Sequence, residues 1–214
     1  MNKEISVTEA FMALKPFINR DDAFAVMKDG LNEYFVVKEF LFPKYLKDHI
    51  DGQATIGVFQ IAKDNTIKWL CWDFDADSEE PQHLEIVLNE AKRLYEHLKI
   101  LDYFPLMEFS GRRGYHVWLF LEKTEAELAQ SFAKNIAEEL ALSNVEVFPK
   151  QARLDKKGYG SMVKLPLGIH RVSNKRSFLL DDEFNELNLS DSFHVLKNVK
   201  INIIKRFENF KNPL

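Results

Sequence analysis

Hydrophobic and polar residues alternate with two different periods along this chain, and the two periods occur in a regular order. Alternation with period two predicts strands over 67–75, 104–109, 115–121 and 145–148. Apolar residues at helical spacing predict one helix from Leu84 to Leu98 and a second from Leu128 to Leu140. The resulting order, strand-helix-strand-strand-helix-strand, predicts an α+β fold.

Weaker patterns surround this unit. Ser6 and Glu9 predict a capping box that opens a first helix, and Thr124 with Glu127 predicts another. Residues 23–27 with 34–38, and 54–60 with 67–75, are each expected to form a hairpin. A short helix is predicted over 43–50, strands over 161–165 and 176–180, and a last helix over 198–210.

Composition limits the classes of function. The 214 residues are 46% hydrophobic, enough for one good core or two small lobes. A net charge of −4 argues against broad, non-specific DNA affinity, so nucleic acid would need a local basic groove. The single cysteine, Cys71, excludes an intrachain disulfide and a cysteine-rich zinc site. No signal peptide or membrane-length apolar run is found, so we expect a cytoplasmic protein without a membrane partner.

Asp73 and Asp75 are the first candidate for chemistry. Side chains alternate across a strand, so these two carboxylates share one face and lie about 7 Å apart along it. Unpaired, they would repel each other, and a divalent cation removes that conflict. Oxygen ligands suit Mg²⁺ or Mn²⁺. Two solvated acids at a strand end are the alternative.

The second candidate is a glycine-rich turn between two strands, over residues 109–118. Arg112 and Arg113 at its tip can bind phosphate oxygens in bidentate fashion, and glycines such as Gly114 let backbone N–H groups approach an anion. His116 follows one residue into the next strand. Carboxylates for metal ions together with a phosphate-binding turn predict nucleotidyl or phosphoryl transfer.

These residues resemble the motifs of the archaeo-eukaryotic primase superfamily. Residues 69–75 resemble its first motif, hydrophobic residues followed by Asp-x-Asp, and residues 110–118 resemble its second, Ser-Gly-x-x-Gly-x-His. Residues 164–171 are similar to the segment after the third motif. Residues 49–52, 55–58 and 145–151 resemble the primase-polymerases of TOTE conflict systems and CRISPR-associated loci. The resemblance covers roughly residues 20 to 180.

The resemblance implies a fold and a set of site residues. It implies an RRM-like antiparallel catalytic lobe over about 61–214, including the C-terminal helix, beside an accessory lobe over about 1–60. A third carboxylate would complete the metal site; we expect it to be Glu146 on a later strand, with Asp155 in a loop as the rival. The residues expected to bind the nucleotide are Ser110, Arg112, Arg113, Gly114, His116, Lys164, His170 and Arg171. Those expected to bind the template are Lys150, Gln151, Lys156 and Lys157.

We therefore predict a template-dependent polymerase with primase activity, using two Mg²⁺ or Mn²⁺ ions and no zinc. Its expected partners are dNTPs or NTPs, single-stranded or primed DNA, and defence proteins of CRISPR or mobile-element systems. A repair polymerase that fills gaps without priming, a silent nucleic-acid-binding module and a metal-dependent phosphohydrolase remain as alternatives.

Overall fold

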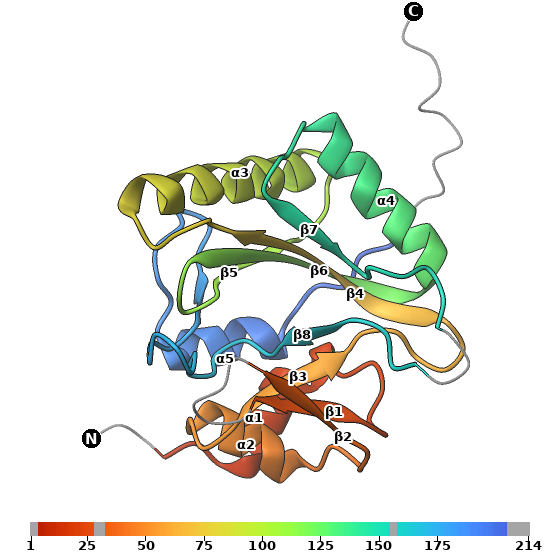
Figure 1. The fold of residues 1–214 in the computed structure, drawn as a ribbon, viewed down its shortest axis with the longest axis vertical. Coiled ribbons are helices and arrows are strands. Elements are labelled where there is room, and N and C mark those ends of the chain that lie inside the picture. The colour runs from red at the N-terminus through yellow and green to blue at the C-terminus, as the bar shows by residue number, and fades with distance from the viewer. Residues whose placement is uncertain (1–3, 28–32, 155–157, 205–214) are drawn as a thin grey trace, which may run out of the picture.

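A computed structural model describes residues 4–27, 33–154 and 158–204. Figure 1 shows two sheets, with helices α3 (Pro81–Ile100) and α4 (Ala126–Glu139) covering the larger sheet on one side. The smaller sheet and helices α1 (Val7–Leu14) and α2 (Pro43–Ile50) lie at the opposite end of the molecule. The predicted α+β class is confirmed.

The larger sheet has five antiparallel strands in the order β7-β4-β6-β5-β9. Their bounds are Val145–Phe148, Thr66–Asp75, Gly114–Glu125, Leu106–Phe109 and Phe178–Leu180. The first four, with α3 and α4, give the predicted strand-helix-strand-strand-helix-strand order. Its first and third strands, β4 and β6, lie at the centre, which is the RRM-like arrangement.

Strand β4 separates two environments because its side chains alternate. Leu70, Trp72 and Phe74 are buried in the core formed with α3 and α4, and Trp72 Nε1 donates to the carbonyl of Ala133 in α4 at 3.0 Å. Cys71 is buried on the opposite face, in a second core that reaches the smaller sheet. The two candidate aspartates therefore lie on the face that looks toward the smaller sheet.

The smaller sheet has the order β2-β1-β3-β8, with bounds Tyr34–Val37, Phe24–Met27, Thr55–Phe59 and Met162–Lys164. Strand β8 comes from the C-terminal third of the chain and pairs with β3. Helices α1, α2 and α5 (Leu189–Lys197) contribute to the core between the sheets. The division into lobes over about 1–60 and 61–214 stays a prediction, and β8 adds residues 162–164 to the sheet built by the N-terminal part.

Several local predictions are confirmed. Ser6 and Glu9 form the reciprocal capping box of α1, strands β1 and β2 pair as expected, and α2 covers the predicted range. No helix in the described ranges combines the length and apolar character that crossing a membrane would require.

Three local predictions are wrong. Residues 62–66 do form a tight turn, but β3 and β4 belong to different sheets and make no hairpin. Thr124 lies within β6 and bonds the carbonyl of Glu122, while Glu125 precedes α4 without a side-chain cap. The last helix is α5, which ends at Lys197; residues 198–204 are not helical, and 205–210 lie outside the described residues.

Candidate functional site

The register of the larger sheet aligns three candidate residues on one face. Asp73 on β4 is paired with His116 on β6 and with Glu146 on β7. Directly paired residues on neighbouring strands place their side chains on the same side of the sheet. Asp75 is paired with Gly114, and a Cβ at Gly114 would lie 2.9 Å from the Asp75 carboxylate and 2.6 Å from the carbonyl of Phe74. A glycine is therefore needed where the turn crosses β4.

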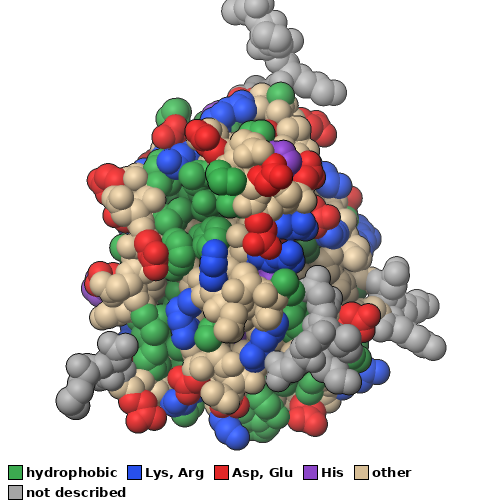
Figure 2. All heavy atoms as spheres, turned by 60° about the vertical axis from the view of Figure 1, so that its left-hand side comes forward, with side chains coloured by type: hydrophobic (Ala, Val, Ile, Leu, Met, Phe, Trp, Pro, Cys, Tyr) green, Lys and Arg blue, Asp and Glu red, His purple; other side chains and the backbone are tan. Residues whose placement is uncertain are grey.

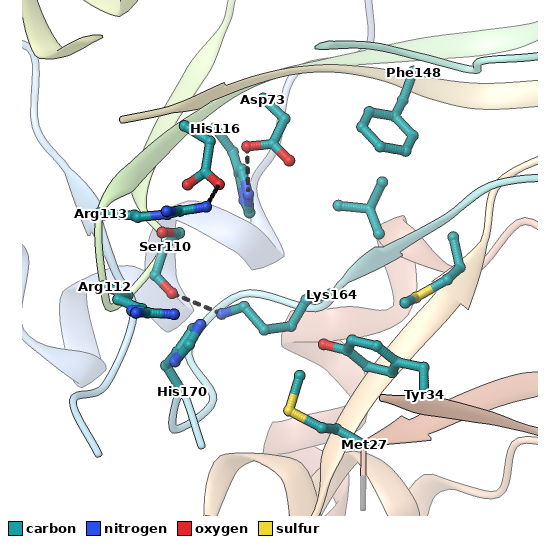
Figure 3. A pocket seen from close by; sticks show the side chains of 13 residues that line it. Met27, Tyr34, Asp73, Ser110, Arg112, Arg113, His116, Phe148, Lys164 and His170 are labelled. Carbon is teal, nitrogen blue, oxygen red and sulfur yellow. Dashed lines mark hydrogen bonds and ion pairs between the residues drawn. The ribbon is translucent and has the colours of Figure 1, made fainter. Parts of the chain in front are cut away.

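The two aspartates and the glycine-rich turn line one pocket of about 270 Å³. Figure 3 shows Asp73 and His116 across the pocket from Tyr34 and Met27. Its polar lining comprises Asp73, Asp75, Ser110, Arg112, Arg113, His116, Lys164 and His170. Its apolar and aromatic lining comprises Met27, Tyr34, Phe148, Met162 and Val163. The larger sheet supplies the acids, and the smaller sheet supplies most of the apolar wall.

Behind this pocket lies a buried carboxylate that the sequence analysis missed. Glu108 on β5 has no exposed surface. Its Oε2 accepts hydrogen bonds from His116 Nδ1 at 2.9 Å and from Trp118 Nε1 at 3.0 Å. The other imidazole nitrogen, Nε2, lies 3.4 Å from Asp73 Oδ1. A single acid within an apolar strand, two residues before the glycine-rich turn, was the signal that could have revealed it.

His116 is consequently a cation held between two acids. Burial opposes its protonation, but the charges of Glu108 and Asp73 outweigh burial and raise the pKa of His116 to about 10. Burial also opposes the charge of Glu108, yet His116 and Lys164 lower the pKa of that carboxyl below its usual value. His116 is therefore positively charged at neutral pH and suited to contact an anion.

The two arginines of the turn are paired with acids. Arg112 Nε donates to Glu79 Oε1 at 2.6 Å, and Arg113 Nη2 donates to Asp75 Oδ2 at 2.8 Å. These pairs are partly exposed, so each contributes little to stability and can exchange its partner. Arg113 thus lies directly against one of the two candidate metal ligands.

The end of β8 and the segment after it bring further residues to the turn. Lys164 Nζ donates to the carbonyl of Ser110 at 3.0 Å, and burial lowers the pKa of Lys164. His170 lines the pocket, and its Nδ1 accepts from the backbone N–H groups of Val172 and Ser173. Burial, with nearby Lys164 and Arg112, lowers the pKa of His170 to about 4. Arg171 lies outside the pocket lining and donates to Thr55 Oγ1 at 3.0 Å.

The candidates on and after β7 lie at the periphery. Glu146 shares the face of Asp73, but its carboxylate is 2.7 Å from Lys150 Nζ and does not line the pocket. Gln151 Oε1 accepts from the backbone and hydroxyl of Ser161, so it holds the chain before β8. The rival third carboxylate, Asp155, and the basic pair Lys156 and Lys157 lie outside the described residues.

The donors at the pocket suit a hard divalent ion in kind. Asp73 and Asp75 offer carboxylate oxygens from one strand face, beside cations suited to phosphate. Within the ranges that the structure describes, no three His, Cys, Asp or Glu side chains are grouped closely enough to hold a metal. A complete site with Glu146 would require this side chain to leave Lys150.

Charge on the surrounding surface is mixed. Figure 2 shows Lys and Arg side chains interspersed with Asp and Glu on one face, with hydrophobic side chains exposed between them. This agrees with the acidic net charge of −4. Positive charge on this face is therefore interspersed with negative charge and does not form one continuous basic surface.

Comparison with known proteins identifies the family to which the chain belongs. Residues 33–210 match the family model described as "TOTE conflict system, Archaeo-Eukaryotic Primase domain". No curated protein matches the chain.

Solved structures resemble its fold. The polymerase domain of Mycobacterium tuberculosis Ligase D, in complex with DNA, has a TM-score of 0.57 at 15% identity, covering 90% of this chain and 87% of that one. The AEP domain of the cyanophage S-2L primase-polymerase has a TM-score of 0.49 at 8% identity, with 91% and 100% covered. Primase RepB' has a TM-score of 0.48 at 11% identity, with 89% and 61% covered. Because the family model spans most of its length, the chain belongs to the archaeo-eukaryotic primase domain family of TOTE conflict systems.

Proposed function

We propose that this chain is a template-dependent nucleotidyltransferase, a primase-polymerase that extends a 3′-hydroxyl with an incoming nucleotide. One observation carries the proposal: Asp73 and Asp75 line the same pocket as the basic glycine-rich turn. The acids are suited to the reacting groups and the turn to the phosphates, which is the arrangement that phosphoryl transfer requires. Family membership supports the general class of reaction.

The phosphate side of the pocket is built from charged donors. We assign the triphosphate to Arg112, Arg113 and His116, with Ser110 and Lys164 beside them. Two Mg²⁺ or Mn²⁺ ions held by Asp73, Asp75 and Glu146 would supply Lewis-acid stabilisation of the transferring phosphoryl group. Arg113 would exchange its contact with Asp75 for a phosphate oxygen, since a metal ion at Asp75 replaces the charge that the guanidinium now supplies.

The apolar wall of the pocket suits the remainder of a nucleotide. Tyr34 and Met27 lie on the smaller sheet, opposite Asp73, and Met162 of β8 lines the same pocket. A flat aromatic and two thioether side chains provide contact area for a base and a sugar without reading their polar edges. We therefore assign the phosphates of the nucleotide to the turn and its base to the smaller sheet.

Template DNA is assigned to the loop after β7. Lys150 and Gln151, with Lys156 and Lys157, would follow the backbone of a single strand. The proposed test is to neutralise Lys156 and Lys157 together. Unprimed synthesis should fall more than primer extension, and the defect should deepen with salt. Equal losses would assign the loop to general template binding, and no loss would remove it from the site.

The decisive experiment supplies labelled dNTPs or NTPs to the protein, with Mg²⁺ or Mn²⁺, on primed and unprimed templates. Incorporation on both supports a primase-polymerase, whereas incorporation on the primed template alone supports a gap-filling repair enzyme. Release of inorganic phosphate or mononucleotides without incorporation would indicate a phosphohydrolase. Binding of DNA without any product would indicate a silent module. Asp73→Asn in parallel separates products of this pocket from those of a contaminating polymerase.

A further inference from the structure

Glu108 is a carboxylate whose burial has no explanation in packing. Transferring a carboxylate from water to a protein interior costs several kcal/mol unless its partners compensate. Its neighbours in the register are His116 on β6 and Leu179 on β9. Replacing a whole group of buried charges by apolar side chains of similar volume is often neutral in stability, so packing alone does not require a charge here. The reason for a charge at this position must therefore lie in the groups that Glu108 contacts.

Trp118 alone does not require a charged partner. The other two buried tryptophans of the sheet donate to neutral backbone carbonyls, Trp69 to Phe17 at 2.8 Å and Trp72 to Ala133 at 3.0 Å. Only Trp118 donates to a carboxylate, that of Glu108. Besides Trp118 and the neutral hydroxyl of Ser177, Glu108 faces two buried cations of the pocket, and only these two call for a charged partner.

Those two cations come from different sheets. His116 on β6 places Nδ1 2.9 Å from Glu108 Oε2, which leaves Nε2 directed at Asp73 and the pocket. Lys164 on β8 places Nζ 3.9 Å from Glu108 Oε1 while it donates to the carbonyl of Ser110. Both side chains are nearly buried and line the pocket. One carboxylate thus contacts a cation from each wall.

We propose that Glu108 is a positioning residue, which anchors His116 and Lys164 from behind so that both present their N–H groups to the phosphates of the bound nucleotide. This inference rests on the proposed binding of a nucleoside triphosphate in the pocket. Glu108 itself touches no substrate. Its contribution is to fix two donors before the ligand arrives, which removes the cost of ordering them on binding.

Glu108→Gln separates this role from packing. The amide has nearly the same shape, and its oxygen can still accept from His116 and Trp118. Its NH₂ group then faces Lys164, so an attraction becomes a repulsion between donors. The probe is inorganic tripolyphosphate, titrated calorimetrically, because it reports phosphate contacts without base, sugar or turnover. We expect the dissociation constant to rise about tenfold, the usual magnitude for a charge-assisted contact.

A double-mutant cycle with Lys164→Met provides the readout that a structural role would not change. If Glu108 acts through Lys164, Glu108→Gln in the Lys164→Met background should weaken tripolyphosphate binding much less than in the wild-type background. Equal losses in both backgrounds would overturn the proposal. Trp118→Phe is the matched control. The substitution removes a donor to the same carboxylate, and Trp118 does not line the pocket. This substitution should lower the thermal midpoint and leave tripolyphosphate affinity unchanged.

Two further outcomes keep the test decisive. If Glu108→Gln does not fold, Glu108→Asp retains the charge but withdraws it from both cations, and unchanged tripolyphosphate affinity in that variant would overturn the proposal. Failure of the wild-type chain to incorporate nucleotides, with tripolyphosphate binding intact and sensitive to Glu108, would remove the polymerase assignment and leave the role of Glu108 standing. If the wild-type chain polymerises nucleotides but tripolyphosphate affinity does not change on substitution of Glu108, the polymerase assignment would stand and the role of Glu108 would be overturned.

Discussion

The two faces of the five-stranded sheet are made by the same strands and differ in nearly every property. On the face toward α3 and α4, Leu70, Trp72 and Phe74 pack in an apolar core. On the other face, the apolar core continues only as far as Cys71, and Asp73 and Asp75 then open into a pocket. One face stabilises the fold, and the other exchanges part of its apolar packing for charge.

This difference explains how the fold tolerates a charged site at the centre of its sheet. The helix-covered face is buried without ionisable groups among its β4 residues, so the strand stays in place whatever happens on the opposite face. Asp73 and Asp75, with their partners His116 and Arg113, therefore lie on a strand whose other face is held by apolar packing. Substitutions on the two faces should have opposite signatures.

The largest effect is expected on the pocket face. Asp73→Asn or Asp75→Asn should lower nucleotide incorporation at least about a hundredfold, because charge stabilisation by a bound metal ion is worth several kcal/mol. Primer extension with labelled nucleotides measures this, and circular dichroism checks the fold. Near wild-type incorporation by either variant would show that the metal site lies elsewhere.

Asparagine is preferred to alanine in that test. Asp73 has a buried partner, since the ring of His116 lies 3.4 Å from its carboxylate. Asp73→Ala would leave this nitrogen without its partner and would mix a loss of stability with a loss of activity.

Trp72→Phe tests the helix-covered face. It leaves a cavity and removes the hydrogen bond to Ala133, so the free energy of unfolding should fall by about 1–3 kcal/mol. Activity per folded molecule should be unchanged. Urea denaturation and primer extension on the same preparation measure both quantities. If activity fell with stability intact, the two faces would not be independent.

A smaller effect is expected at the tip of the turn. Arg112→Gln and Arg113→Gln should each raise the KM for the nucleotide about tenfold, because each removes one charge-assisted contact to phosphate. The two need not be equal, since Arg113 contacts Asp75 and Arg112 contacts Glu79. Lys175→Gln, on the neighbouring loop and outside the pocket lining, is the matched charge control. An unchanged KM in both arginine variants would move the triphosphate away from the turn.

The last test, whose effect within any one pH unit is no larger than the preceding ones, sharpens the contrast between two buried histidines. His49, unlike His116, is hydrogen-bonded to backbone groups: its Nδ1 accepts from the N–H of Ile56, and its Nε2 donates to the carbonyls of Leu165 and Pro166. Burial, with the charge of Lys164, lowers the pKa of His49 to about 3.

The sign of the pH effect follows. Between the unfolded pKa of about 6.5 and the folded value of about 3, only the unfolded chain binds a proton at this position. The contribution of neutral His49 to the free energy of unfolding is fully present above the unfolded pKa. Below that pKa it decreases as the pH is lowered, by at most about 1.4 kcal/mol per pH unit. Urea denaturation at several pH values should show a smaller slope for His49→Gln than for the wild type. Identical slopes would mean that His49 is already protonated in the folded state.

The sequence predicted features that follow from the local hydrophobic period, such as the face on which a side chain lies. It missed features that depend on which strands pair in the folded molecule. Strand alternation was enough to place Asp73 and Asp75 on one face, and the pocket contains both. The prediction of a β3–β4 hairpin was wrong because the local sequence determines the turn but not the strand partners. β3 pairs with β1 and β8, while β4 pairs with β6 and β7. Glu108 was missed because its burial depends on β9 and on Lys164, both far along the chain.

The placement of β8 has a mechanical consequence. Its backbone is hydrogen-bonded to β3 in the smaller sheet, yet the end of Lys164 is bonded to Ser110 at the edge of the larger one. A separation of the two sheets larger than the lysine side chain can span would break this contact with the turn. Such a separation would therefore also remove part of the positive charge with which the pocket can bind an anion.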